Sequence, residues 1–143
     1  MEIYPASYLK IYLLPVPDGK GDWMSYRVAF ASSDGAKIDR HFGAAEGFVI
    51  LEVQEDGSYL EVEKRAGHPP CRHGFHHEKA MREAVQNLSD CLYVAAEAIG
   101  PGAQKALERE GVLPLEVQEI TIEEAVRQIH KYQVNKERAS VKY

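Results

Sequence analysis

The order in which strand-like and helix-like patterns follow one another restricts the fold of this 143-residue chain more than any other feature. Three strand patterns come first: short apolar runs over 28–31 and 47–53, then an alternating segment over 58–64. The "QEDG" between the last two carries the Asp-Gly pair that is typical of a hairpin turn. Beyond residue 76, helical spacing alternates with apolar, strand-like runs.

The second half of the chain predicts two helix–strand units and a closing helix, over "HHEKAMREAVQNL", "CLYVAAEAIG", "PGAQKALEREG", "VLPLEV" and "TIEEAVRQIHKY". Thr121 and Glu124 form a capping box at the start of the last helix. The whole order, β-β-β-α-β-α-β-α, predicts an α/β domain in which helices pack on a mixed five-stranded sheet. It is compatible with a ribonuclease-H-like arrangement, in which the first strand lies beside the first strand of the αβ half.

The chain is long enough for one domain with a sizeable core, which we place over residues 25–133. Residues 1–24 form an N-terminal extension rich in Tyr and Leu, which ends in the loop-forming "PVPDGKGD". This extension is either a partner-binding arm or a segment that adds a strand to, or packs on, its own domain. Residues 134–143 are expected to form a frayed, polar C-terminal tail.

Charge and hydropathy argue against several classes of partner. The net charge is -5 and no basic stripe is present, which argues against nucleic acid. The sequence shows no signal peptide and no apolar run long enough to span a bilayer, so we expect a cytoplasmic protein without a membrane partner. In a reducing cytoplasm the two cysteines, Cys71 and Cys91, are not expected to form a disulfide. Cys91 begins an apolar strand pattern, which favours a place in the core.

Two loops are expected to meet at the carboxyl edge of the sheet, where ligands collect in open α/β folds. The first, "SSDGAKIDRHFG", contains Arg40 and His41. The second, "EAIGPGA", places Gly100 and Gly102 at the start of a helix, where the backbone amides either bind an anion or belong to simple hinges. Asp39 either orients the imidazole of His41 or caps a turn.

The heptapeptide "CRHGFHH", residues 71–77, concentrates side chains that bind metals. A thiolate and imidazoles suit iron, copper, zinc or a metal–sulfur cluster better than magnesium or calcium. The alternatives are that the cysteine is a small apolar filler and that the histidines are exposed at the start of a helix. We expect this segment to enter the helix from the opposite end of the third strand and to fold over the carboxyl edge. Its candidate ligands are Cys71, His73, His76 and His77.

Two motifs resemble the dinitrogenase iron–molybdenum cofactor biosynthesis family, which includes NifX/NafY-like carriers and the C-terminal domain of NifB-type proteins. "VAFASSDGAKIDRHFGAAEGFVILEV" has a strand, then S-x-D-G, D-x-H-F-G and a strand entered by an aromatic residue. In "DCLYVAAEAIGPGAQKALEREGVLPLEV" an apolar strand ends in Ile-Gly, and a helix leads to a final strand. The resemblance covers about residues 25–130. Residues that fit the first motif are Ser33, Asp34, Gly35, Asp39, His41, Phe42, Gly43 and Phe48.

The resemblance implies a ribonuclease-H-like fold without nuclease activity. It also implies a protein that binds or carries an iron–sulfur or iron–molybdenum cluster, or its precursor, with His41 in the family's cluster-binding role. The implied partners are cofactor-biosynthesis proteins or a nitrogenase apo-protein. Together with the loops described above, this gives predicted cofactor-binding residues Ser33, Asp39, Arg40, His41, Gly100 and Gly102, and predicted metal ligands His41, Cys71, His73, His76 and His77.

Two rival functions are weighed against this one. A zinc-binding regulatory or interaction module would use Cys71, His73 and either His76 or His77 as ligands. A ribonuclease-H-type hydrolase needs several carboxylates around divalent ions, but the middle of the first strand carries no acid. The sequence therefore favours a non-enzymatic carrier of an anionic cluster, and it leaves the oligomeric state open.

Overall fold

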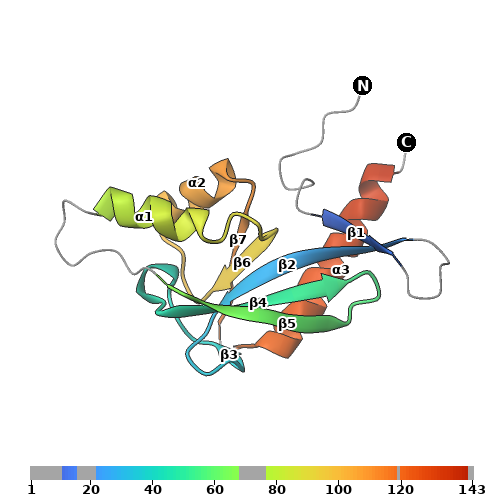
Figure 1. The fold of residues 1–143 in the computed structure, drawn as a ribbon, viewed down its shortest axis with the longest axis horizontal. Coiled ribbons are helices and arrows are strands. Elements are labelled where there is room, and N and C mark those ends of the chain that lie inside the picture. The colour runs from blue at the N-terminus through green and yellow to red at the C-terminus, as the bar shows by residue number, and fades with distance from the viewer. Residues whose placement is uncertain (1–10, 16–21, 68–76, 119, 142–143) are drawn as a thin grey trace.

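The computed structural model describes residues 11–15, 22–67, 77–118 and 120–141, and these form a layered α/β domain (Figure 1). The strands are β1 (Ile11–Pro15), β2 (Asp22–Ala31), β3 (Lys37–Ile38), β4 (Gly47–Gln54), β5 (Tyr59–Ala66), β6 (Tyr93–Ala96), β7 (Leu113–Glu116) and β8 (Ile120–Thr121). The helices are α1 (His77–Gln86), α2 (Pro101–Arg109) and α3 (Ile122–Val141), with a short 3-10 helix over Phe42–Ala44.

The main sheet runs through the domain in the order β5-β4-β2-β6-β7. The pairs β2–β4 and β4–β5 are antiparallel, whereas β2–β6 and β6–β7 are parallel. Val28 of β2 stands beside Tyr93 of β6, so the first strand of the meander adjoins the first strand of the αβ half. The predicted mixed sheet and this predicted pair of neighbours are confirmed.

The N-terminal extension contributes a further strand. β1 pairs antiparallel with the first half of β2, from Ile11 opposite Tyr26 to Pro15 opposite Asp22. The strand-adding alternative for the extension is therefore confirmed over residues 11–15. A two-stranded ladder between β3 and β8 was not expected, because strands of two residues leave no periodic pattern in a sequence.

Helices cover both faces of the main sheet: α1 and α2 pack on one face and α3 packs on the other (Figure 1). Val85 of α1 and Leu107 of α2 are buried with side chains of the first face, such as Ile50. Val126 and Ile129 of α3 are buried against the second face. Burying one such aliphatic side chain stabilises a fold by about 1.5–3 kcal/mol, so these two cores fix the strands whose ends build the site.

The closing helix begins where the sequence indicates and continues further than expected. The Thr121 hydroxyl accepts the N–H of Glu124 at 3.1 Å, as the capping box predicts. The helix then runs to Val141, through the residues expected to fray from 134 onward. Polarity did not end the helix because Lys, Glu, Arg and Ala, which are frequent in this stretch, all have good helix propensity.

Cys91 is fully buried between the first core face and Asp90, which confirms the core interpretation of this cysteine. Burial raises the pKa of its thiol to about 12. Since the thiolate is the reactive form and the metal-binding form, Cys91 has no place in a ligand site.

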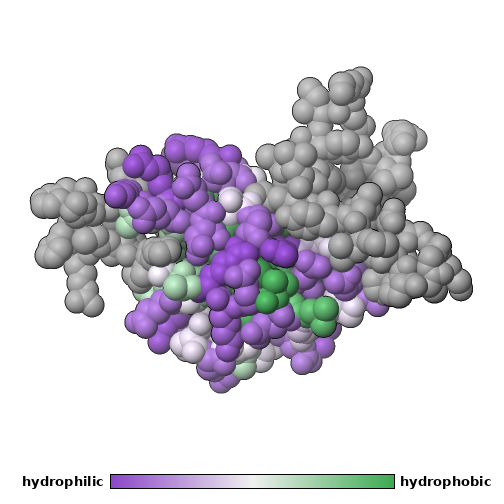
Figure 2. Space-filling model, in the orientation of Figure 1, coloured by the Kyte–Doolittle hydropathy of each residue, from purple (hydrophilic) through white to green (hydrophobic). Residues whose placement is uncertain are grey.

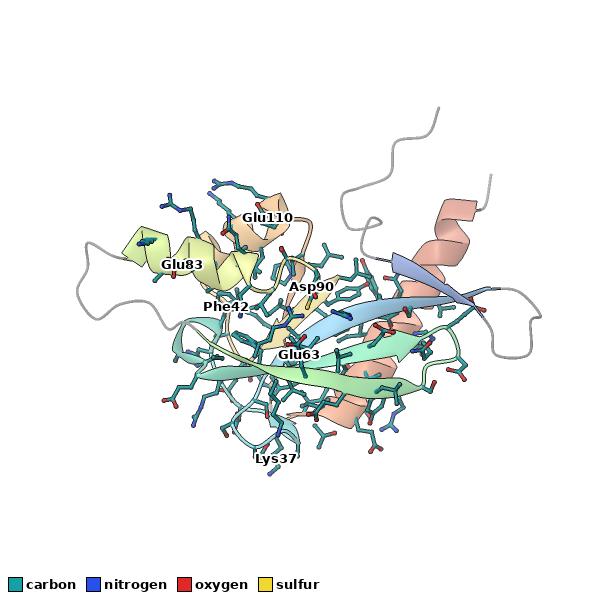
Figure 3. All side chains as sticks on the ribbon, in the orientation of Figure 1. Lys37, Phe42, Glu63, Glu83, Asp90 and Glu110 are labelled. Carbon is teal, nitrogen blue, oxygen red and sulfur yellow. The ribbon has the colours of Figure 1, made fainter. Side chains whose placement is uncertain are left out.

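Half-buried charges on the α1 side of the sheet are paired with one another. Arg65 on β5 donates to both oxygens of the Asp90 carboxylate, at 2.6 and 2.7 Å, and Arg27 on β2 donates to it at 2.9 Å. Figure 3 shows Asp90 and Glu63 over the middle of the sheet. The guanidinium of Arg65, followed by that of Arg27, holds the pKa of Asp90 well below its usual value. This cluster links β2 and β5 to the start of β6.

The surface seen in Figure 2 is mostly hydrophilic, apart from an apolar patch over β5. The exposed large apolar side chains of that strand are Tyr59, Leu60 and Val62. None of the helices in the described part of the chain has both the length and the apolar character needed to cross a bilayer.

Candidate functional site

The carboxyl ends of four strands meet at one edge of the sheet. β2, β6 and β7 are parallel, and β5 runs in the same direction because β4 is antiparallel to both β2 and β5. Ala31 lies opposite Phe48 at the end of β2, and Ala66 lies opposite Gly47 at the end of β5. The loop after β2, the start of α2 and the segment after β5 therefore leave from the same edge (Figure 1).

This geometry corrects one expectation. The cysteine- and histidine-rich segment was expected to come from the opposite end of the third strand and to fold across the domain. The meander reverses direction twice, so the third strand ends at the same edge as the first. The segment therefore starts at the carboxyl edge of the sheet, where the sequence predicts the ligand site.

Gly67, the last residue described before this segment, is packed closely against the start of β4. Its N–H donates to the carbonyl of Glu46 at 2.8 Å, and a Cβ atom at Gly67 would lie 2.0 Å from the carbonyl oxygen of Ala45. The segment that contains Cys71 follows Gly67 directly in the sequence.

The predicted ligands of this segment fall mostly outside the described residues. Cys71, His73 and His76 lie in the undescribed range 68–76. His77 is the first residue of α1, and its side chain is not described. Their ligand roles stay predictions.

The loop after β2 is held in shape by its own side chains. The Asp34 carboxylate accepts the N–H groups of Ala36 and Lys37, at 2.8 and 3.0 Å. The Asp39 carboxylate accepts the N–H of Ser33 at 2.9 Å and its hydroxyl at 2.5 Å, and donation from this hydroxyl lowers the pKa of Asp39. Asp39 thus matches the turn-capping alternative, with its two oxygens engaged by Ser33.

His41 lies beside the end of β6. Backbone hydrogen bonds flank it on both sides: the Glu97 N–H donates to the Arg40 carbonyl, and the Phe42 N–H donates to the Ala98 carbonyl, each at 2.8 Å. The His41 Nε2 faces the Glu97 carboxylate at 3.6 Å, while 65% of the His41 side chain is exposed. The imidazole is accessible to a ligand, and the backbone that carries it is fixed.

Sequence reasoning missed Glu97. This residue is a single carboxylate at the end of an apolar strand, at the edge where ligands collect. That combination is the signal that would have identified it.

The start of α2 offers fewer free amides than the sequence suggested. The Ile99 N–H donates to the Glu116 carboxylate at 2.8 Å, and the Gln104 side chain donates to the Ile99 carbonyl at 2.9 Å. The space around Gly100 and Gly102 is open, with no atom within 4 Å of a Cβ placed at either position. Both glycines therefore lie on an accessible surface, two and four residues beyond Ala98, whose carbonyl accepts the N–H of Phe42.

A cavity of about 320 Å³ adjoins the loop after β2. Ser33 and Arg40 line it from the loop, and Lys64 lines it from β5. Among the described residues, neither the Arg40 guanidinium nor the Lys64 ammonium has an ion-pair partner. Asp34 and Glu46 also line the cavity, so its formal charge is balanced. Lys64 was missed because the sequence does not show which residue of β5 faces the distant loop.

The described donors fit a metal–sulfur cluster better than a bare metal ion. Within the described residues, no three His, Cys, Asp or Glu side chains gather around one point. A bare transition-metal ion needs about four such ligands from the protein. A metal–sulfur cluster brings most of its own ligands as sulfide, so it needs fewer ligands from the protein than a bare ion does.

A family model described as dinitrogenase iron-molybdenum cofactor matches residues 24–132. The matched region begins in β2 and ends in α3. It therefore contains the main sheet and the whole edge described above.

Several curated relatives carry the name protein NifX. The chain is 33% identical over 106 residues to NifX of Azotobacter vinelandii, which covers 74% of this chain and 65% of that protein. It is 35% identical over 91 residues to NifX of Klebsiella pneumoniae, and this aligned region covers 64% of this chain and 56% of that protein. The chain thus spans less than two thirds of the length of these relatives.

The apo form of the orange protein from Desulfovibrio gigas has a similar fold. The TM-score is 0.56 over 76% of this chain and 89% of that chain, with 22% sequence identity. At this identity the likeness concerns the α/β fold alone.

Proposed function

The chain belongs to the dinitrogenase iron–molybdenum cofactor family, and from this premise we propose that it carries an anionic iron–sulfur or iron–molybdenum cluster, or a precursor. The NifX relatives support a part in iron–molybdenum cofactor biosynthesis. Family members of this kind bind or carry cofactor and are not enzymes, which agrees with the non-enzymatic prediction. No observation favours the zinc-binding alternative.

The meeting of three segments at one edge of the sheet is the observation that carries the proposal. His41 comes from the loop after β2, and Gly100 from the start of α2, and their backbones are joined through Phe42 and Ala98. Cys71 belongs to the segment that starts at the same edge after β5. A cluster at this edge is therefore within reach of an imidazole, a thiolate and the first amides of a helix.

Each predicted residue has a distinct role in the proposed site. His41 and Cys71 are ligands, and His73, His76 and His77 are further donors. Arg40 and the backbone N–H groups of Gly100 and Gly102 offset the negative charge of the cargo by charge-assisted hydrogen bonds. Ser33 and Asp39 hold the loop that presents His41.

A carrier has to release what it binds. Four rigid thiolates would hold a cluster tightly, whereas few ligands of mixed type release it more easily. The exposure of the His41 side chain, 65%, also leaves room for an acceptor protein to approach the bound cluster. The proposed partners are cofactor-biosynthesis proteins or a nitrogenase apo-protein, in the cytoplasm.

The test is anaerobic reconstitution. Wild type, His41→Ala and Cys71→Ser are incubated with ferrous iron and sulfide without oxygen, desalted, and compared by visible absorption and iron content. His130→Ala is the matched histidine control, because His130 lies in α3 and binds Tyr26. We expect cluster retention in wild type and His130→Ala and clear loss in the other two variants. Equal retention in all four proteins would refute the proposal.

Two finer assignments complete the proposal. A ribonuclease-H-like classification is supported by the order β5-β4-β2-β6-β7, with three antiparallel strands followed by two parallel ones. The division into an extension (1–24), a carrier domain (25–133) and a tail (134–143) is supported at its first boundary by the family match from residue 24.

A further inference from the structure

Glu97 is held beside His41 by the backbone and not by the side-chain contact alone. The two hydrogen bonds that flank His41 both end on the segment Glu97–Ala98, each at 2.8 Å. The backbones that carry the imidazole and the carboxylate are therefore fixed relative to each other. The 3.6 Å between Nε2 and Oε1 is longer than a hydrogen bond, and both side chains are partly exposed.

The other acid close to His41 in the sequence is engaged elsewhere. Asp39 accepts two hydrogen bonds from Ser33, one on each carboxylate oxygen. Moving it toward His41 would open the loop after β2. The role that the sequence left open for Asp39, an acceptor that orients the imidazole, therefore falls to Glu97.

A histidine ligand binds metal through one ring nitrogen, and its other N–H is usually donated to a carboxylate or a carbonyl that fixes the tautomer and the ring direction. Glu97 faces Nε2. We propose that Glu97 is a positioning residue for His41 and that the cargo is bound through Nδ1. This inference rests on the proposed function, in which His41 is a ligand of the cluster.

The rival arrangement has Nε2 and the Glu97 carboxylate binding the same metal atom. Carboxylate oxygens are hard donors, whereas the iron atoms of a sulfide cluster prefer softer ones. Direct ligation would also add a negative charge to an anionic cargo. A carboxylate that accepts Nε2–H instead makes the imidazole a stronger donor at Nδ1 without touching the metal.

The first test compares retention of an iron–sulfur cluster assembled from ferrous iron and sulfide without oxygen. Glu97→Gln is expected to lower retention by about 10-fold, the lower end of the range for loss of such a supporting carboxylate. Glu110→Gln is the matched control, because Glu110 is an exposed carboxylate at the far end of α2 (Figure 3) and is expected to leave retention unchanged. The thermal unfolding midpoints of both variants are expected to equal that of wild type, because 65% of the His41 side chain is exposed.

The second test asks which nitrogen binds. His41 is replaced by Nδ1-methylhistidine or by Nε2-methylhistidine, each with and without Glu97→Gln. Blocking Nδ1 is expected to reduce retention to the level of His41→Ala. Blocking Nε2 is expected to reduce it only about 10-fold, and Glu97→Gln is expected to add nothing further, because the contact is already lost.

The outcomes separate this inference from the proposed function. Full retention by His41→Ala removes the proposed function and the inference together. Loss in His41→Ala with full retention in Glu97→Gln, or with full retention when Nδ1 is methylated, overturns only the inference. Complete loss on Nε2 methylation together with full retention on Nδ1 methylation supports the shared-metal arrangement and contradicts positioning.

Discussion

Two histidines lie at opposite ends of the sheet in opposite surroundings. His130 of α3 uses both ring nitrogens, with Nδ1 at 3.0 Å from the Tyr26 hydroxyl and Nε2 at 2.9 Å from the Glu55 carbonyl, and its ring stacks on Tyr26. His41, at the carboxyl edge, has 65% of its side chain exposed and faces Glu97 through Nε2 alone among the described residues. Both nitrogens of the His130 imidazole are bonded to other residues of the protein, whereas the His41 imidazole is exposed.

The difference distinguishes a structural histidine from the histidine that we propose as a ligand. An imidazole with both nitrogens bonded internally has no lone pair to offer to a metal, so His130 clamps the β4–β5 hairpin onto α3. In His41, one ring nitrogen faces a carboxylate and the side chain is exposed, which is the arrangement usual for a histidine that binds metal. The clamp was missed because its partners lie 104 and 75 residues away.

The largest expected effect is on cargo. His41→Ala is expected to lower cluster retention by clearly more than the about 10-fold loss expected for Glu97→Gln, which corresponds to more than about 1.4 kcal/mol of binding free energy. Its free energy of unfolding is expected to stay within about 0.5 kcal/mol of wild type, because the side chain is exposed. Urea denaturation and the iron content after desalting measure the two quantities. A large fall in the free energy of unfolding without loss of iron would show that His41, like His130, has a structural role.

His130→Ala is expected to behave in the opposite way. It removes two side-chain hydrogen bonds, each worth about 1 kcal/mol, so the free energy of unfolding is expected to fall by about 2 kcal/mol. Retention of the cluster is expected to be unchanged. Lys131→Ala, at the exposed neighbouring position of the same helix, is the control and is expected to have little effect in either assay.

The stability of the fold is expected to depend on pH through Asp90 and not through the exposed edge that carries His41. The pKa of Asp90 is lowered in the folded protein by Arg65 and Arg27, so its stabilising contribution is present above the unfolded value and is lost as pH falls below it. Asp90→Asn is expected to lower the free energy of unfolding by about 1.5 kcal/mol at pH 7, after allowance for solvent screening.

The matching measurement is urea denaturation of wild type and Asp90→Asn between pH 7 and pH 2. The difference in stability between the two proteins is expected to shrink below about pH 4, where the unfolded carboxyl becomes protonated. A difference that stays constant down to pH 2 would show that the ionised Asp90 carboxylate does not stabilise the fold.

The smallest expected effect concerns the hairpin that His130 clamps. Gly57 has φ +91°, and a Cβ there would lie 3.2 Å from Cδ2 of His130, whereas Gly35 has φ +78° and open space. Gly57→Ala is expected to cost about 1 kcal/mol, and more than Gly35→Ala, because a contact adds to the backbone strain. In the His130→Ala background the two costs are expected to become equal. Thermal denaturation of the four glycine variants, with wild type and His130→Ala as their two reference proteins, tests this.

The order of the elements could be predicted because each long element carries its own period. The apolar run ending at Ala31, the Asp56-Gly57 turn and the Thr121 cap are all local signals, and each lies where it was expected. The short strands β3 and β8 left no such signal, and the polar composition after residue 134 was mistaken for a helix end.

The candidate site could be predicted only in its local parts. The position of His41 at the carboxyl edge followed from the loop after an apolar strand. Its pairing with Glu97, and the presence of Lys64 at the cavity, depend on which strands are neighbours and in what register. The segment after Gly67 starts at the carboxyl edge because the chain reverses direction twice, between β2 and β4 and between β4 and β5. The pattern within any single segment does not show these reversals.

Pulsed electron paramagnetic resonance of the cluster-loaded protein with ¹⁵N-labelled histidine tests the central claim most directly. In a background with His73, His76 and His77 replaced by alanine, the account predicts a directly coordinated ¹⁵N nucleus with and without His130→Ala, and loss of that coupling in His41→Ala. In this background, a coupling that persists in His41→Ala, or that disappears in His130→Ala, would contradict the assignment of the open imidazole at the carboxyl edge as the ligand of the cargo.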